Sequence, residues 1–176
     1  MDTAPLRITR LRPTKNDLPE KSRRQAVGLL NKRLADAIDL QTQTKTAHWN
    51  VKGPAFIALH ELFDEINEAV EGYVDLIAER AVQLGGVAEG TARTVAERSE
   101  LDEYPLDIKS ERLHVEALSS ALSAFGSRVR LAISEADDLD DADTADIFTE
   151  ISRGVDKWLW FVEAHLQGEE SAPRRK

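Results

Sequence analysis

Residues 56–84 read FIALHELFDEINEAVEGYVDLIAERAVQL, and apolar side chains recur through this stretch at alternating spacings of three and four. That period is typical of one long amphipathic helix. Gly53-Pro54 comes before the stretch and Gly85-Gly86 comes after it, and these residue types begin and end helices. The sequence therefore predicts a long helix from about residue 55 to residue 84.

Three further segments show the same period. One starts near Ser22, where Ser22 and Gln25 make a capping box, and runs to His48. The others cover about 109–136 and about 144–167. Helices of ~25–30 residues are each about 40 Å long at 1.5 Å per residue. We expect four long helices that share one core.

The connections predict the topology. The first and second helices are joined by a few residues around Gly53, and the third and fourth by an acidic stretch near Asp138, so each pair forms an antiparallel hairpin. Residues 85–108 are long enough to run the length of the bundle, and TVAERSEL (94–101) can form a short extra helix within them. We predict an all-α, ferritin-like four-helix bundle with a long crossover between its second and third helices.

The length and charge of the chain limit its domain number and its binding partners. The 176 residues, 41% of them hydrophobic, fit one domain, which we place at 22–167 between flexible basic tails at 1–21 and 168–176. The net charge of −9 argues against a nucleic-acid clamp on the folded body. No apolar run reaches the ~20 residues that span a bilayer, and no secretory leader is visible, so we expect a cytoplasmic protein. The candidate DNA-contacting residues are those of the tails: Arg7, Arg10, Arg12, Lys15, Arg174, Arg175 and Lys176.

Four metal-binding side chains lie along the second helix: His60, Asp64, Asp75 and Glu79. At about 100° per residue they fall within about 100° of one another, and we call this set the ligand stripe. Asp64 and Asp75 are about 16 Å apart along the axis, so one helix cannot bring both to one metal ion.

The ligand stripe is palindromic about position 69.5, because 60 mirrors 79 and 64 mirrors 75. A second copy packed antiparallel across a two-fold axis near Ala69 and Val70 would place His60 and Asp64 opposite its own Asp75 and Glu79. One dimer would then hold two equivalent metal sites. His48, at the polar end of the first helix, is a plausible further ligand.

The chain has no cysteine, so a metal must be bound by imidazole and carboxylate. Such ligands suit iron, manganese or zinc, and a ligand-poor site with open positions favours iron redox chemistry. Trp49 follows His48 directly, and an indole beside an iron–peroxide centre can be oxidised in place of a diffusing radical. We therefore assign Trp49 a redox role.

The segment Thr46-Ala47-His48-Trp49-Asn50, together with the spacing of the ligand stripe, resembles the Dps family, the DNA-binding proteins from starved cells. The resemblance covers about 22–167, including Asp156-Lys157-Trp158-Leu159-Trp160-Phe161. It implies a dodecameric shell with iron-oxidising sites at dimer interfaces, which uses hydrogen peroxide in preference to dioxygen and stores ferric mineral. Carried over, the iron ligands are His48, His60, Asp64, Asp75 and Glu79, with Trp49 nearby.

Plainer interpretations exist for other residues. Glu111 and His114 form a single Glu-x-x-His, half of a motif that needs two, so we expect surface or packing roles. His165 stands alone and is expected to be solvated or packed. Trp158 is expected in the core, and Trp160 at an interface or near the metal.

The acidic run that ends the third helix has two interpretations. In the Dps family it lines pores that admit Fe(II), for which the candidates here are Asp141, Asp143 and Asp146. Alternatively, Asp143 caps the fourth helix and Asp146 stabilises its first turn. Both can hold together.

Three functions compete at this point: an iron-oxidising storage shell that protects DNA, a nucleoid-associated protein that gathers DNA through its basic tails, and a metal-free helical adaptor. A metal-free adaptor leaves the palindrome unexplained. DNA binding by the tails is expected to be weak and salt-sensitive, because three acidic residues interrupt the N-terminal tail.

Overall fold

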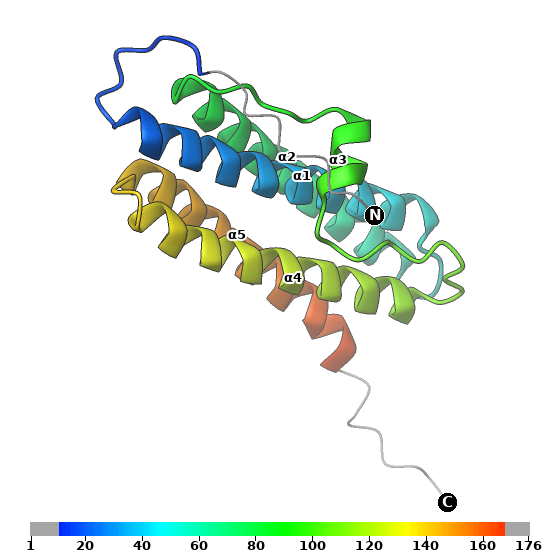
Figure 1. Ribbon diagram of the computed structural model, residues 1–176. Helices are drawn as coiled ribbons and strands as arrows, with labels where there is room; N and C mark the ends of the chain where they lie inside the picture. Colours follow the sequence, from blue (N-terminus) through cyan, green and yellow to red (C-terminus); the bar gives the residue numbers. More distant parts are fainter. Residues whose placement is uncertain (1–10, 168–176) are drawn as a thin grey trace, which may run out of the picture.

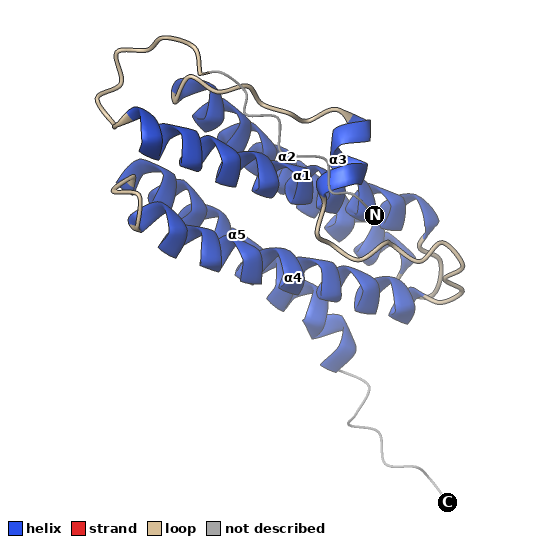
Figure 2. Ribbon diagram, in the orientation of Figure 1, coloured by secondary structure: helices blue, strands red, loops and turns tan. Residues whose placement is uncertain are grey.

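The computed structural model describes residues 11–167 of the chain. Its helices are α1 (Glu20–Asn50), α2 (Phe56–Gln83), α3 (Ala92–Arg98), α4 (Glu111–Asp137) and α5 (Ala142–Gln167). Within residues 11–167 there is no strand, and Figure 2 shows helices joined by loops. The predicted all-α class is confirmed.

The four long helices form two hairpins that pack into one bundle (Figure 1). α1 packs antiparallel to α2, and α4 packs antiparallel to α5. The segment 84–110 returns along the bundle and carries α3, which packs against α1, so α4 begins at the same end as α2. The predicted long crossover with a short extra helix is therefore confirmed, with the short helix at 92–98.

All four long helices contribute to one hydrophobic core. Its largest fully buried side chains include Leu30, Leu34, Phe63, Ile66, Phe125 and Phe148. Burying one such side chain is worth about 1.5–3 kcal/mol, so the shared core supplies most of the stability of helices whose own propensity is modest. Val70 belongs to this core and is fully buried. Any two-fold contact near position 69.5 must therefore use the opposite side of α2.

The start of α1 differs from the prediction. The helix begins at Glu20 with Pro19 at its N-cap and no side-chain cap, so Ser22 lies inside the first turn and the predicted capping box is absent. Arg23 holds this end instead, because its guanidinium donates to the carbonyls of Leu18 and Leu84. The domain boundary expected at residue 22 thus falls two residues inside α1.

Residues 11–19 form a loop, and both ends of this loop contact the bundle. The Arg12 amide donates to the Gly85 carbonyl at 2.7 Å, and the side chains of Leu11 and Leu18 pack against the core. Gly85 has a φ of +87°, and the amides of Gly85 and Gly86 return to the carbonyls of Val82 and Ala81. This is a Schellman motif, which confirms the predicted glycine stop of α2.

No helix within residues 11–167 has the length and apolar character that spanning a membrane requires.

Candidate metal centre

The last turn of α1 and the first turns of α2 bring His48 and His60 together. Their rings stack with centroids 3.7 Å apart and planes inclined by 22°. Nδ1 of His48 lies 2.8 Å from the backbone carbonyl of His60, and Nδ1 of His60 lies 2.9 Å from the backbone carbonyl of His48. The short connection at 51–55 places these two helix ends side by side.

These reciprocal hydrogen bonds determine where the ring protons sit. A carbonyl oxygen can only accept, so Nδ1 carries the proton and donates in both histidines. Nε2 of each ring is then the nitrogen left for another partner. Metal-binding histidines are oriented in the same way, with the second ring nitrogen donating to a carbonyl or carboxylate.

Asp64 lies one turn beyond His60 and extends the same site. Its carboxylate is 3.8 Å from Nδ1 of His48 and forms an ion pair with the Lys45 ammonium. The hydrogen bond from Lys45 lowers the pKa of Asp64, with smaller contributions from the two histidines. The carboxylate is therefore ionised at neutral pH, and the ammonium occupies a position beside it that a metal cation would also favour.

Asp75 and Glu79 lie nearer the other end of α2 and are exposed. Within residues 11–167 of a single chain, no three histidine, aspartate or glutamate side chains come together as a metal site. His48, His60 and Asp64 are thus adjacent, while Asp75 and Glu79 are separated from them along the helix. Trp49 directly follows His48 and is 68% exposed.

Sequence reasoning missed two residues at this site. Lys45 lies three residues before His48, a spacing that places both on one face of α1, so helical geometry was the available signal. Phe56 packs against the His60 ring with centroids 5.1 Å apart and supports its outer face. Nothing in the spacing of the ligand stripe points to Phe56.

Glu111 and His114 have the packing roles expected of them. The Glu111 carboxylate accepts a hydrogen bond from the Ala55 amide at 3.1 Å and so joins α4 to the start of α2. Gly53 has a φ of +144°, and a Cβ there would collide with this carboxylate, which explains the glycine. His114 is buried against Tyr104.

The remaining aromatic and histidine predictions concern α5, and the interface role of Trp160 stays a prediction. Trp158 is buried, which confirms its predicted core position, and Trp160 is exposed on the same helix. His165 is exposed near the end of α5, in agreement with a solvated role.

The acidic run before α5 has a different cap from the one predicted. Asp141, not Asp143, caps the helix, because its carboxylate accepts from the Thr144 amide and hydroxyl. The buried Arg80 selects Asp141 through an ion pair at 2.6 Å and also donates to Thr144. Asp141 is therefore buried in the single chain, whereas Asp143 and Asp146 are exposed. The pore role of all three stays a prediction.

Of the candidate DNA-contacting residues, Arg12 and Lys15 are exposed. The others lie outside the described residues: Arg7, Arg10, Arg174, Arg175 and Lys176.

Comparison with known proteins agrees with this architecture. The family model of the ferritin-like domain matches residues 27–171. A DNA protection during starvation protein of Agrobacterium fabrum is 47% identical over 154 residues, which cover 88% of this chain and 95% of that protein.

Two solved structures are also similar. Mycobacterium smegmatis Dps in its tetragonal form has a TM-score of 0.84 at 31% identity, with 93% of this chain and 100% of that chain covered. DpsA14 from Streptomyces coelicolor has a TM-score of 0.85 at 31% identity, with 95% and 99% covered.

Proposed function

Since the chain belongs to the Dps family of ferritin-like proteins, we propose that it oxidises Fe(II) and stores the ferric product in a hollow shell. Hydrogen peroxide is the preferred oxidant, with dioxygen as the slower alternative. Two Fe(II) ions reduce one peroxide to two waters, with two protons consumed, so no hydroxyl radical is released. Removing iron and peroxide together protects DNA in the cytoplasm.

The observation that carries this proposal is the histidine pair. Both rings donate from Nδ1 to a backbone carbonyl, which leaves Nε2 to face another partner, and an ionised Asp64 lies next to them. Neutral imidazole with carboxylate and no thiolate is a ligand set that iron accepts. The site is ligand-poor in one chain, which leaves positions for peroxide once a second chain adds Asp75 and Glu79.

The exposed side chains of α2 extend the palindrome and support the two-fold arrangement. Ile57 is 60% exposed and Val82 is 50% exposed, although both are apolar. They mirror one another about position 69.5 and lie within the angular range of the ligand stripe. In an antiparallel pair Ile57 of each chain would meet Val82 of the other, which would bury apolar surface on either side of the metal ligands.

In this arrangement each residue has a defined task. His60 and Asp64 bind Fe(II) from one subunit, with His48 beside them, and Asp75 and Glu79 complete the site from the other. Trp49 supplies an electron if peroxide is reduced by one electron instead of two. The complete shell is a dodecamer, and exposed Asp143 and Asp146, with Asp141, mark its iron entry.

The direct test is iron oxidation by the assembled protein. Given Fe(II) and substoichiometric peroxide, it should form a soluble ferric product, and Asp75→Ala with Glu79→Ala should slow that oxidation. The matched control is Glu65→Ala with Glu135→Ala, which removes two exposed carboxylates outside the ligand stripe. Equal slowing in both double variants would contradict the site assignment.

A subunit-mixing experiment tests the shared site. One variant carries His60→Ala with Asp64→Ala, and the other carries Asp75→Ala with Glu79→Ala. Each should oxidise Fe(II) slowly alone, but a mixed dimer regains one intact site, because one chain keeps its first pair and the other keeps its second. If mixed assemblies show no activity above that of the two variants, the ligands do not come from two chains.

A second candidate function is DNA binding through the basic tails, and the Agrobacterium fabrum relative is named for DNA protection. Arg12 and Lys15 are exposed, but residues 22–167 hold 15 Lys/Arg against 27 Asp/Glu, a net charge of −12 that is more negative than the −9 of the whole chain. We expect a gel shift that is lost at moderate salt and after deletion of residues 1–10 and 172–176. This deletion leaves residues 11–19, which contact Gly85, in place. A shift that persists after the deletion excludes the outer tails as the binding elements.

A further inference from the structure

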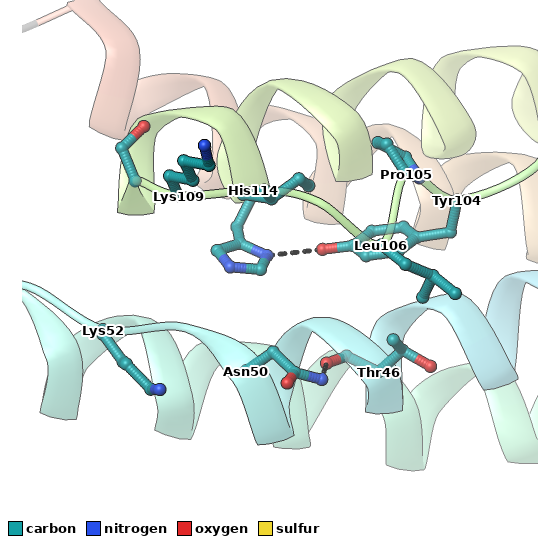
Figure 3. A pocket seen from close by; sticks show the side chains of 10 residues that line it. Thr46, Asn50, Lys52, Tyr104, Pro105, Leu106, Lys109 and His114 are labelled. Atoms are coloured by element: carbon teal, nitrogen blue, oxygen red, sulfur yellow. Dashed lines mark hydrogen bonds between the residues drawn. The ribbon is translucent and has the colours of Figure 1, made fainter.

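Tyr104 and His114 form a buried hydrogen-bonded pair beside the end of α1. The Tyr104 hydroxyl lies 2.6 Å from Nδ1 of His114, and the two residues are only 7% and 4% exposed. Figure 3 shows the phenol, which comes from the crossover, pointing at the imidazole on α4, with Asn50 and Thr46 of α1 on the opposite wall of the cavity. The cavity has a volume of about 350 Å³.

The surroundings of His114 decide which group donates. Burial lowers the pKa of His114, so the ring is neutral at physiological pH, and a hydrogen bond to the backbone of Asn50 acts in the opposite direction. The Asn50 carbonyl accepts a hydrogen bond from the other ring nitrogen of His114, Nε2. Nδ1 therefore keeps its lone pair, which faces Tyr104. Burial also raises the pKa of Tyr104, so the phenol keeps its proton and donates it to Nδ1.

This pair contacts the helix end that carries the candidate metal centre. Asn50, whose backbone bonds to His114, is the residue after Trp49 and the second after His48. Two residues of helix correspond to about 3 Å along its axis. The pair thus contacts the last turn of α1, which also carries His48 and Trp49.

We propose that Tyr104 and His114 form a one-electron donor site that reduces an oxidised Trp49. In this step the O–H bond of Tyr104 breaks, its electron passes to the indolyl radical of Trp49, and its proton bonds to Nδ1 of His114. The indole regains its own proton from water. The products are intact Trp49, a neutral tyrosyl radical, an imidazolium ion and the hydroxide left by the water, so the oxidising equivalent leaves the metal centre.

The oxidant in the cell would be a hydroxyl radical, formed when one Fe(II) reduces peroxide by one electron to hydroxide and hydroxyl radical. Abstraction of the indole hydrogen of Trp49 then yields water and the indolyl radical. For this oxidant the inference rests on the proposed function. The hydrogen-bonded arrangement of Tyr104 and His114 does not depend on iron.

Tyr73 provides a matched comparison, because the chain has two tyrosines. The Tyr73 hydroxyl receives a hydrogen bond from the Trp158 side chain. An indole N–H only donates, so Trp158 cannot take the phenolic proton, whereas His114 can. Oxidation should therefore end at Tyr104 and not at Tyr73.

Pulse radiolysis of the assembled, iron-free protein tests the proposal. Azidyl radicals oxidise indoles, and transient absorption then follows decay of the indolyl radical and growth of the tyrosyl radical. In the wild type the tyrosyl radical should grow as the indolyl radical decays, more slowly in D₂O. Tyr104→Phe should lose this growth and Tyr73→Phe should keep it. Trp49→Phe should reduce it more than Trp160→Phe.

Two results would overturn the inference: tyrosyl growth that survives Tyr104→Phe, or indolyl radicals that form in the wild type and decay with no tyrosyl radical. Freeze-quench electron paramagnetic resonance after Fe(II) and peroxide supplies the second readout, with a tyrosyl signal in the wild type that Tyr104→Phe lacks. If azidyl radicals produce the tyrosyl radical and iron with peroxide oxidises nothing, the proposed function fails and the donor pair stands.

Discussion

The two ends of α2 hold their candidate ligands in different ways. At the first end, His60 is hydrogen-bonded to the His48 backbone and Asp64 is paired with Lys45. Toward the other end, Asp75 and Glu79 are exposed, and the next residue, Arg80, makes the buried contacts. An imidazole binds a metal through one nitrogen, so its direction must be set, whereas a carboxylate offers about four lone-pair sites. The chain fixes the directional ligands and leaves the adaptable ones for a partner.

The largest effect is a loss of stability, and it is expected at the buried ion pair that holds the second end of α2. Asp141→Ala leaves the Arg80 guanidinium buried without its carboxylate, and breaking a buried ion pair in this way costs about 3–5 kcal/mol. Urea unfolding at fixed protein concentration measures the loss.

The control for this anchor is Asp143→Ala. Arg80 also lies 3.5 Å from Asp143, but the Asp143 side chain is 82% exposed, and such pairs contribute about 0–1 kcal/mol. If the two variants lose equal stability, the buried pair does not anchor α2, and the contrast between its ends has another cause.

The next largest effect concerns the fixed histidines. His60→Gln removes an oriented Nε2. Removing a residue that only positions a metal ligand lowers metal affinity by about 10–100-fold, so losing a ligand should lower the Zn²⁺ affinity by at least as much. Calorimetric titration of the assembled protein with Zn²⁺ as a probe measures it. His165→Gln, which changes an exposed histidine on α5, should leave the affinity unchanged. Equal affinities in wild type and His60→Gln would remove His60 from the site.

A smaller loss of stability, one that depends on pH, is expected from His114, which lies in the first turn of α4 and bonds to the Asn50 backbone at the end of α1. Burial lowers its pKa below the ordinary 6.5, so the unfolded chain binds the proton more readily than the folded one. The stability it contributes is complete above about pH 6.5 and is lost as the pH falls toward its folded pKa, by at most about 1.4 kcal/mol per pH unit.

Urea unfolding at several pH values between 7.5 and 5.5 tests this dependence. His114→Gln should flatten the pH profile relative to the wild type, because glutamine does not titrate. His165→Gln should retain the wild-type slope. A wild-type slope in His114→Gln would show that other groups cause the acid sensitivity.

Local patterns predicted the helices well. The helix expected at about 55–84 is α2 at 56–83, because hydrophobic period and Gly-Gly stops are properties of neighbouring residues. The caps at Ser22 and Asp143 were wrong, because distant residues decided them. Arg23 anchors the start of α1 to Leu84, and Arg80 selects Asp141 over Asp143.

The same distinction applies to the candidate site. The ligand stripe follows from the geometry of one helix, and the His48–His60 contact follows from a short connection. The pairing of Tyr104 with His114 could not be predicted, because Tyr104 lies in a crossover without periodicity whose path sets the contact. Lys45 could have been predicted as part of the site, since it precedes His48 by three residues on the same helix.

Lys45 allows the smallest and sharpest test of the contrast. Its ammonium and a divalent cation compete for the Asp64 carboxylate, so Lys45→Met should strengthen Zn²⁺ binding. The pair is partly exposed, which limits the gain to about two- to fivefold. Lys52→Met removes an exposed charge near the same end of α1 and should change the affinity less. Weaker binding in Lys45→Met would show instead that the ammonium positions Asp64, and that this carboxylate, like the two histidines, needs a partner within its own chain.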